Sequence, residues 1–358
     1  MVNNQTKFSF FQRLLRNRGA VLGLCIICLA LVTALLAYLL APDATSNANR
    51  IILELAARQP GHVQQFVKLP RSQVTPTPAW KAWWLGRDDA VTYVPIEHWQ
   101  VQNDTLVATR LVDEGITEPL LLALQGRNPQ ELLHKQRFWL GTDKFGRDLL
   151  SRLLVGVRVS LSVGAVAVLL SLFMGITLGM LAGYYRGRID AVITWLINVV
   201  WSIPTLLLVF AFTLALGKGY WQVFCAIGFT LWVNVARLVR GQVLAVRELN
   251  YIEAARAMGF SSVRIMFRHI LPNIMGPVGV LAAGNFATAI IMEAGLSFLG
   301  LGVQPPQPSW GLMIKENYNF IITNNLVLAL APGLAIMLLV LAFNLLGNGL
   351  RDALDVRA

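Results

Sequence analysis

The sequence predicts an all-α integral membrane protein, and three observations support this prediction. Hydrophobic residues make up 56% of the 358-residue chain and charged residues only 14%, with a mean hydropathy of +0.58. Soluble domains carry roughly a quarter charged residues. The apolar residues gather in runs of about 20, the length that crosses a bilayer as a helix. Short basic segments flank these runs, as they do in membrane proteins.

Six apolar runs are predicted as transmembrane helices. The first, about 19–41, carries no charge, and its length favours a retained signal anchor over a cleaved signal peptide. The other five are predicted at about 160–185, 191–216, 221–236, 273–296 and 326–349. Pro204 is expected to kink the third helix, either to line a cavity or to improve packing. Gly175, Gly179 and Gly183 stand four residues apart, a spacing that predicts close helix packing.

The distribution of Lys and Arg in the short segments predicts that both termini are cytoplasmic. Fourteen such residues lie on the side of the termini, and only Lys218 and Lys315 lie in the opposite short loops. Cytoplasmic loops carry the excess of positive charge in membrane proteins. The basic balance is therefore explained by topology, and no nucleic-acid partner is expected.

The polar residues 42–157 are predicted to form an extracytoplasmic insert of mixed or irregular structure. Segments 91–101 and 104–112 alternate weakly between apolar and polar residues, which predicts short strands, and three prolines mark 70–78 as a linker. The histidines of the insert stand 36 residues apart, so no metal site is predicted. Five tryptophans either seal the insert or anchor it at lipid headgroups: Trp80, Trp83, Trp84, Trp99 and Trp139.

Residues 237–272 are too long for a simple turn between two spans and predict a helix–turn–helix on the cytoplasmic membrane face. Glu253 and the alanines after it favour a helix, and Gly259 supplies a left-handed helix stop. A second short helix, 261–270, is expected to end at Pro272. Small residues would allow another protein to approach closely, but a membrane-surface helix fits the arginines equally well.

The sequence EAARAMG followed by HILP resembles the EAA loop of ABC importer permeases. In that family the loop forms a coupling helix seated in a cleft of the cytoplasmic ATPase. The resemblance assigns this role to Glu253, Ala254, Ala255, Gly259, His269, Leu271 and Pro272. His269 replaces the aliphatic residue of the general pattern, as is typical of the dipeptide and oligopeptide branch. Segments 141–161, 293–311 and 347–357 are similar to the same branch, with Asn348 and Val356 as small departures.

This resemblance implies the C-type permease subunit of a dipeptide, oligopeptide or nickel-type ABC importer in a bacterial cytoplasmic (inner) membrane. The implied type I importer fold has an N-terminal arm and first helix (1–41), the insert (42–157), a core with helices 2–6 (158–350) and a cytoplasmic tail (351–358). The implied partners are a homologous second permease, two cytoplasmic ATPases that bind ATP and Mg, and an extracytoplasmic substrate-binding protein. The chain itself would bind no cofactor.

Glu293 is the only acidic residue in a predicted span, and an ionisable group there is a functional candidate. It is expected either to hold an outer gate or to contact the ligand path. Pro204 and, from the motif at 141–161, Asp143, Arg147 and Asp148 are further gate or path candidates. No phosphate-binding loop, nucleophile elbow or zinc motif is present, so no catalytic residue is predicted. A secondary transporter is the alternative, and it would need buried acids near the midplane.

Overall fold

The computed structural model describes residues 10–71, 77–113, 115–217, 219–322 and 325–354. The chain divides into two compact units. We call the first the helical unit; it comprises Met1–Leu31, Ser160–Gln304 and Ala335–Ala358. We call the second the sheet unit; it comprises Val32–Val159 and Pro305–Leu334.

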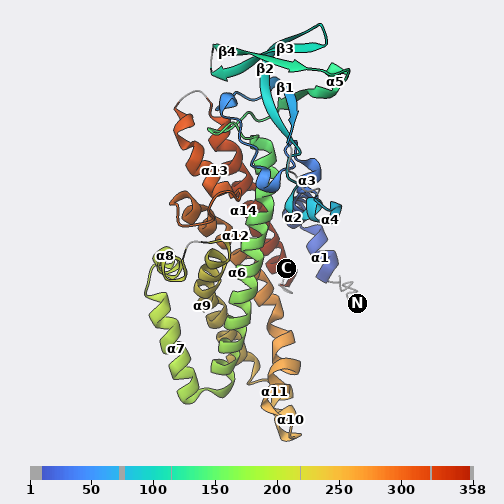
Figure 1. The fold of residues 1–358 in the computed structure, drawn as a ribbon. Helices are drawn as coiled ribbons and strands as arrows, with labels where there is room; N and C mark the ends of the chain where they lie inside the picture. The colour runs from blue at the N-terminus through green and yellow to red at the C-terminus, as the bar shows by residue number, and fades with distance from the viewer. Residues whose placement is uncertain (1–9, 72–76, 114, 218, 323–324, 355–358) are drawn as a thin grey trace. The chain divides into compact units, whose positions relative to one another are not determined.

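Among the described residues, five helices are long and apolar enough to cross a membrane. They are α2 (Arg18–Leu35), α6 (Leu149–Tyr185), α9 (Tyr220–Val246), the run Ser262–Phe298 that ends in α12 (Leu271–Phe298), and α14 (Val327–Leu354) (Figure 1). Two shorter helices, α7 (Gly187–Trp201) and α8 (Thr205–Leu216), make a sixth candidate if they form one broken span. The main part of each predicted run therefore lies on one of these helices or on the broken pair, while the run 19–41 extends past the end of α2 at Leu35.

The structure changes several of the predicted spans: α2 ends at Leu35 rather than at 41, and α6 begins at Leu149 rather than at 160. The run predicted at 221–236 belongs to a longer helix, because α9 continues to Val246 and still buries Val239 and Val243 beyond the predicted end. Pro204 breaks its helix rather than kinking it, since α7 and α8 meet at 94°. A proline disfavours helical geometry at the residue before it, so α7 ends before the proline and α8 begins after it.

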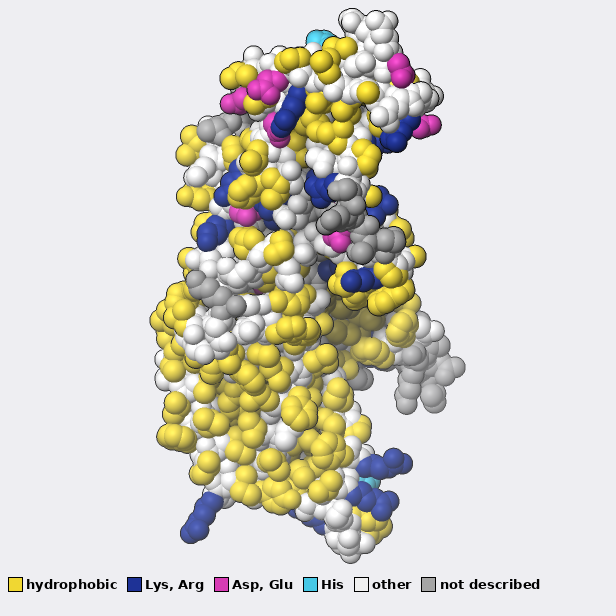
Figure 2. Space-filling view, viewed as in Figure 1, with side chains coloured by type: hydrophobic (Ala, Val, Ile, Leu, Met, Phe, Trp, Pro, Cys, Tyr) yellow, Lys and Arg dark blue, Asp and Glu magenta, His cyan; other side chains and the backbone are white. Residues whose placement is uncertain are grey.

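Hydrophobic side chains cover almost all of the visible surface around α7–α9 (Figure 2). Many large apolar side chains on these helices are exposed, among them Trp195, Leu207 and Trp221. A water-soluble protein rarely exposes apolar patches of more than a few hundred Å². This surface is therefore suited to lipid and to other membrane-embedded chains.

Helices α6 and α9 pack closely, because glycines of α6 lie directly against valine side chains and backbone carbonyls of α9. A Cβ atom added to Gly175, Gly179 or Gly183 would lie 2.4–2.8 Å from an atom of α9. Distances this short leave room for hydrogen only, so each of the three positions requires glycine. The predicted glycine stripe is confirmed as a helix-packing surface within this chain.

Gly179→Val is expected to lower the stability of the helical unit markedly, because the new side chain would overlap Val239 and the Ala236 carbonyl oxygen of α9. Overpacking of a tight core costs roughly 1–3 kcal/mol or more. The unfolding temperature of the purified chain in mild detergent measures the loss. Gly241→Val is the matched control, since a Cβ atom at Gly241 meets nothing within 4 Å; equal losses in the two variants would contradict the packing argument.

The insert, for which the sequence predicts mixed or irregular structure with short strands, contains an ordered sheet. Five antiparallel strands lie in the order β4-β3-β2-β1-β5. The two predicted strands are confirmed as β2 (Val91–Gln102) and β3 (Thr105–Asp113), joined by a two-residue turn whose residues both have positive φ, as tight hairpins require. Three further strands were not predicted: β1 (His62–Pro70), β4 (Ile116–Ala123) and β5 (Leu133–Phe138).

Strand β1 holds the core of this sheet. Phe66 and Val67 are neighbours, so their side chains point to opposite faces, and both are fully buried. Phe66 packs with Leu55 and Phe138, whereas Val67 packs with Leu106. Of the predicted linker 70–78, residues 72–76 lie outside the described part of the chain. The predicted tail at 351–358 continues α14 to Leu354, and residues 355–358 also lie outside it.

Candidate functional site

The loop that resembles a coupling element begins with α10 (Asn250–Ala257), and Gly259 ends this helix as the sequence predicts. Gly259 has φ +79°, and its N–H donates to the Arg256 carbonyl at 2.9 Å. The next N–H, of Phe260, donates to the Ala255 carbonyl at 3.2 Å. This pair of bonds is the Schellman helix stop, which favours glycine at the left-handed position.

One face of α10 is fixed to the membrane helices. Ile252 and Ala255 stand three residues apart on that face and are buried. They share a core with Tyr184 of α6, Val243 of α9 and Ile274 of α12. The loop is therefore a rigid extension of the helical core. Ala255 serves this packing and offers no surface to another protein.

The second half of the loop runs directly into α12. It consists of α11 (Ser262–Arg264) and a π-helical turn, η3 (Ile265–Ile270). The prediction that this helix ends at Pro272 is wrong: the proline lies in the first turn of α12, where a missing N–H is tolerated. The side-chain amide of Asn273 donates to the His269 carbonyl at 2.6 Å and to the Tyr251 hydroxyl at 3.0 Å, which joins the two halves of the loop.

The opposite face of the loop is exposed and carries most of the predicted contact residues. Glu253, Ala254, Gly259 and Pro272 are exposed. His269 is half-buried, with its ring stacked on Phe260 at 5.9 Å, and Leu271 is partly buried against the core. An open hollow of ≈ 700 Å³ lies on the second half of the loop, lined by Val263, Arg264, Phe267, Arg268 and Pro272. This face combines a hollow, exposed apolar side chains and two arginines, and could receive a complementary protein surface.

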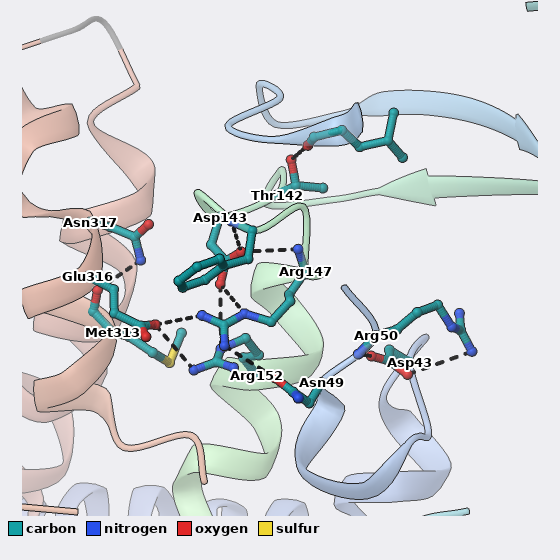
Figure 3. Close-up of polar contacts among 12 residues, drawn as sticks. Asp43, Asn49, Arg50, Thr142, Asp143, Arg147, Arg152, Met313, Glu316 and Asn317 are labelled. Carbon is teal, nitrogen blue, oxygen red and sulfur yellow. Dashed lines mark hydrogen bonds and ion pairs between the residues drawn. The ribbon is translucent and has the colours of Figure 1, made fainter. Parts of the chain in front are cut away.

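Two of the predicted gate or path residues, Asp143 and Arg147, lie in a buried ion cluster of the sheet unit (Figure 3). Asp143 accepts hydrogen bonds from the Arg147 backbone N–H at 3.0 Å and from its Nε at 2.7 Å. Arg147 also donates to Glu316 of α13 (Trp310–Asn317) at 2.6 Å and to Asn49 at 3.2 Å. Arg152 lies 3.5 Å from Glu316 and 3.7 Å from Asp143.

This cluster joins three distant parts of the chain and offers almost no surface to a ligand. Gly146 makes the approach possible: a Cβ atom there would lie 1.7 Å from the Ile52 carbonyl oxygen. Three members of the cluster were not predicted from the sequence: Arg152, Glu316 and Asn49. Glu316 stands 169 residues from Arg147, and no local pattern connects the two.

Asp148 caps the start of α6. Its carboxylate accepts from the Ser151 backbone N–H at 2.9 Å and from the Ser151 hydroxyl, which is the usual arrangement at a helix N-terminus. Burial raises the pKa of Asp148, and the two Ser151 bonds oppose that rise. The side chain is 3% exposed, and its contacts indicate a structural role.

Glu293 is fully buried inside α12 of the helical unit, where it accepts a hydrogen bond from the Ser297 hydroxyl at 2.6 Å. Ser297 in turn accepts from the Val303 N–H at 3.1 Å. Glu293 therefore fixes the turn that follows α12. Pro204 is exposed at the break between α7 and α8. Glu293 and Pro204 thus belong to the helical unit, whereas Asp143, Arg147 and Asp148 belong to the sheet unit.

Comparisons with known proteins agree with the motifs. Residues 175–358 match the family described as "Binding-protein-dependent transport system inner membrane component". Residues 9–60 match "N-terminal TM domain of oligopeptide transport permease C".

Two relatives and one solved structure illustrate the similarity. The glutathione transport system permease protein GsiD of Pectobacterium atrosepticum is 46% identical over 61% of this chain and 72% of its own length. The dipeptide transport system permease protein DppC of Alkalihalophilus pseudofirmus is 41% identical over 70% of this chain and 83% of its own. A chain of the inward-facing MetNI methionine ABC transporter gives a TM-score of 0.47 at 19% identity, over 56% of this chain and 95% of that chain. A similarity at this level carries no conclusion about the fold.

Proposed function

This chain belongs to the family of binding-protein-dependent transport system inner membrane components, and we propose that it is the permease subunit of an ATP-driven importer of short peptides. Members of this family are non-catalytic membrane components, so ATP hydrolysis belongs to partner subunits. The proposed assembly contains a homologous second permease, two ATPases that bind ATP and Mg, and a substrate-binding protein outside the membrane.

The coupling role rests on one observation: the loop at 250–272 is buried on one face and exposed on the other. Its buried face shares a core with three membrane helices. A displacement of the exposed face would therefore move those helices with it, because the loop is packed directly against them. The exposed Glu253, Ala254 and Gly259 and the hollow beside Phe267 would contact the ATPase. ATP binding would draw this loop and its counterpart together and so open the path outward.

The proposed topology has six spans, with α7 and α8 as one broken span and both termini in the cytoplasm. In the helical unit, Lys and Arg side chains gather at the end that carries α10 and α11 (Figures 1 and 2). Under the rule that cytoplasmic loops are basic, that end faces the cytoplasm. Residues 42–157 then lie outside the membrane on the opposite side.

The proposed substrate class comes from the relatives. Their names specify dipeptides, di- and tripeptides, oligopeptides and glutathione, all short chains of amino acids joined by amide bonds. Within that class, the substrate-binding protein would select the individual peptide.

Purification of the full chain from its native membrane in mild detergent tests the proposal. The expected result is that a homologous permease and ATPases with phosphate-binding loops purify with it, and that the assembly in liposomes moves a labelled dipeptide only with ATP and the binding protein. A chain that purifies alone and moves solute without ATP would overturn the coupling role and support a secondary transporter, with Glu293 as the next residue to change.

A further inference from the structure

The short helix α4 (Ala79–Leu85) exposes an unusual amount of aromatic surface. Trp80 is 74% exposed and Trp84 52%, and Trp83 and Leu85 are also exposed. Within the described residues, α4 buries none of its side chains. Tryptophans that seal a protein core would be buried, so these three do not seal the insert.

A single guanidinium fixes α4 to the end of the first membrane helix. Arg158 donates to the carbonyl oxygens of Ala34 at 2.5 Å and Leu35 at 3.1 Å, the last residues of α2. It also donates to the carbonyl oxygen of Trp84 at 2.6 Å, at the end of α4. The last carbonyls of a helix lack partners within the helix and carry partial negative charge. One cation therefore caps the C-terminal ends of both helices.

The backbone after α4 holds the helix in the same place. Gly86 ends α4 at φ +82°, and a Cβ atom there would lie 2.8 Å from the Ser46 backbone. The Arg87 N–H donates to the Ala44 carbonyl at 2.9 Å. These contacts and those of Arg158 all lie within the sheet unit, so α4 sits beside the point where the first span ends.

The apolar surface of α4 continues that of the span. Exposed leucines follow α2 on α3 (Ala37–Leu40), including Leu39 and Leu40, and α3 packs beside α4. Only 17% of the most apolar window of α2 is buried within the chain, so this chain leaves most of α2 uncovered. Tryptophan concentrates where lipid headgroups meet the acyl chains, because its ring is apolar and its N–H is polar.

We propose that α4 is a membrane-surface anchor that inserts Trp80, Trp83 and Trp84 into the outer leaflet of the bilayer beside the first span. The exposed ammonium of Lys81 on the same helix is within reach of lipid phosphates at that depth. The anchor holds the base of the sheet at the membrane surface, so the insert keeps a defined height above the bilayer.

Spin labels at three sites of similar exposure test this anchor. The full chain, with Cys25, Cys28 and Cys225 changed to Ala, receives one label through Trp80→Cys, Leu29→Cys or Leu121→Cys. Leu29 lies in α2 and Leu121 in strand β4; they are 67% and 65% exposed, and Trp80 is 74% exposed. The labelled chains are placed in lipid nanodiscs with the proteins that purify with them, and the collision rates of each label with oxygen and with a water-soluble nickel chelate are measured.

The label at position 80 is expected to behave like the one at 29, with preference for oxygen and several-fold fewer chelate collisions than at 121. Adding Arg158→Gln is expected to raise chelate collisions at 80 and leave those at 29 and 121 unchanged. Equal chelate access at 80 and 121 would overturn the anchor. A label at 80 that is shielded from both oxygen and chelate would also overturn it, because a protein rather than lipid would then cover α4.

Discussion

Gly259→Trp is expected to abolish ATP-dependent peptide uptake while the chain still inserts in the membrane. A Cβ atom at this position meets nothing within 4 Å, so the indole would project from the exposed face of the loop and hold a docked ATPase away. Uptake into liposomes and the amount of ATPase that purifies with the chain are the two measurements. Both are expected to fall to background.

The matched control is Gly259→Ala, which has the same left-handed backbone and little bulk. A left-handed conformation costs a non-glycine residue about 1–2 kcal/mol, and both variants carry this cost. Gly259→Ala is therefore expected to retain most uptake. Loss of uptake in both variants would assign the effect to backbone strain rather than to docking.

A charge reversal on the same face separates docking from folding in a second way. Glu253→Arg combined with Ala254→Arg changes exposed residues only, and it is expected to abolish uptake as well. Ala255→Arg is unsuitable for this test, because Ala255 is buried in the core beside Tyr184 and an arginine there would disturb the fold.

Glu316→Gln is expected to unfold much of the sheet unit. The buried cluster holds Asp143 and Glu316 against Arg147 and Arg152, and removal of one carboxylate leaves an uncompensated positive charge. Breaking a buried pair in this way costs about 3–5 kcal/mol. Faster limited proteolysis within residues 42–138 and a lower unfolding temperature of the purified chain are the measurements.

Glu248→Gln is the control for that experiment. The ion pair of Glu248 with Arg186 (2.5 Å) is as short as that of Glu316 with Arg147 (2.6 Å). The Glu248 side chain, however, is 58% exposed and the Glu316 side chain only 9%. Water screens the exposed pair, so its loss is expected to cost at most about 1 kcal/mol. If both variants lost the same stability, burial would not be the cause.

Much of the helical part of the fold follows from sequence, because its signals are local. A span needs only length and apolar composition, and the stop at Gly259 needs only one residue with left-handed freedom. Strands β2 and β3 alternate and were predicted. Strand β4 is exposed along nearly its whole length and β5 is mostly polar, so neither shows the half-buried pattern that identifies a strand.

The position of the 250–272 loop was predictable from the sequence, but which of its residues face the core and which face outward was not predicted. Ile252 and Ala255 lie three residues apart, the spacing of one helix face, and that spacing could have placed Ala255 inside and Ala254 outside. The residues of the buried ion cluster show no comparable spacing in the sequence that would predict their contact. Arg147 and Arg152 meet Glu316 only because the chain folds back over more than 160 residues, and pairing at that separation depends on the whole tertiary structure.

The helical run Ser262–Phe298, which joins the 250–272 loop to α12, has a mechanical consequence. At about 1.5 Å per residue, its 37 residues form an arm about 55 Å long, with the exposed second half of the 250–272 loop at one end and Glu293 close to the other. A tilt of about 5° would displace one tip against the other by roughly 5 Å, given that length. A tilt of this arm would therefore move the exposed loop and the buried turn at Glu293 together, in opposite directions across the helical unit.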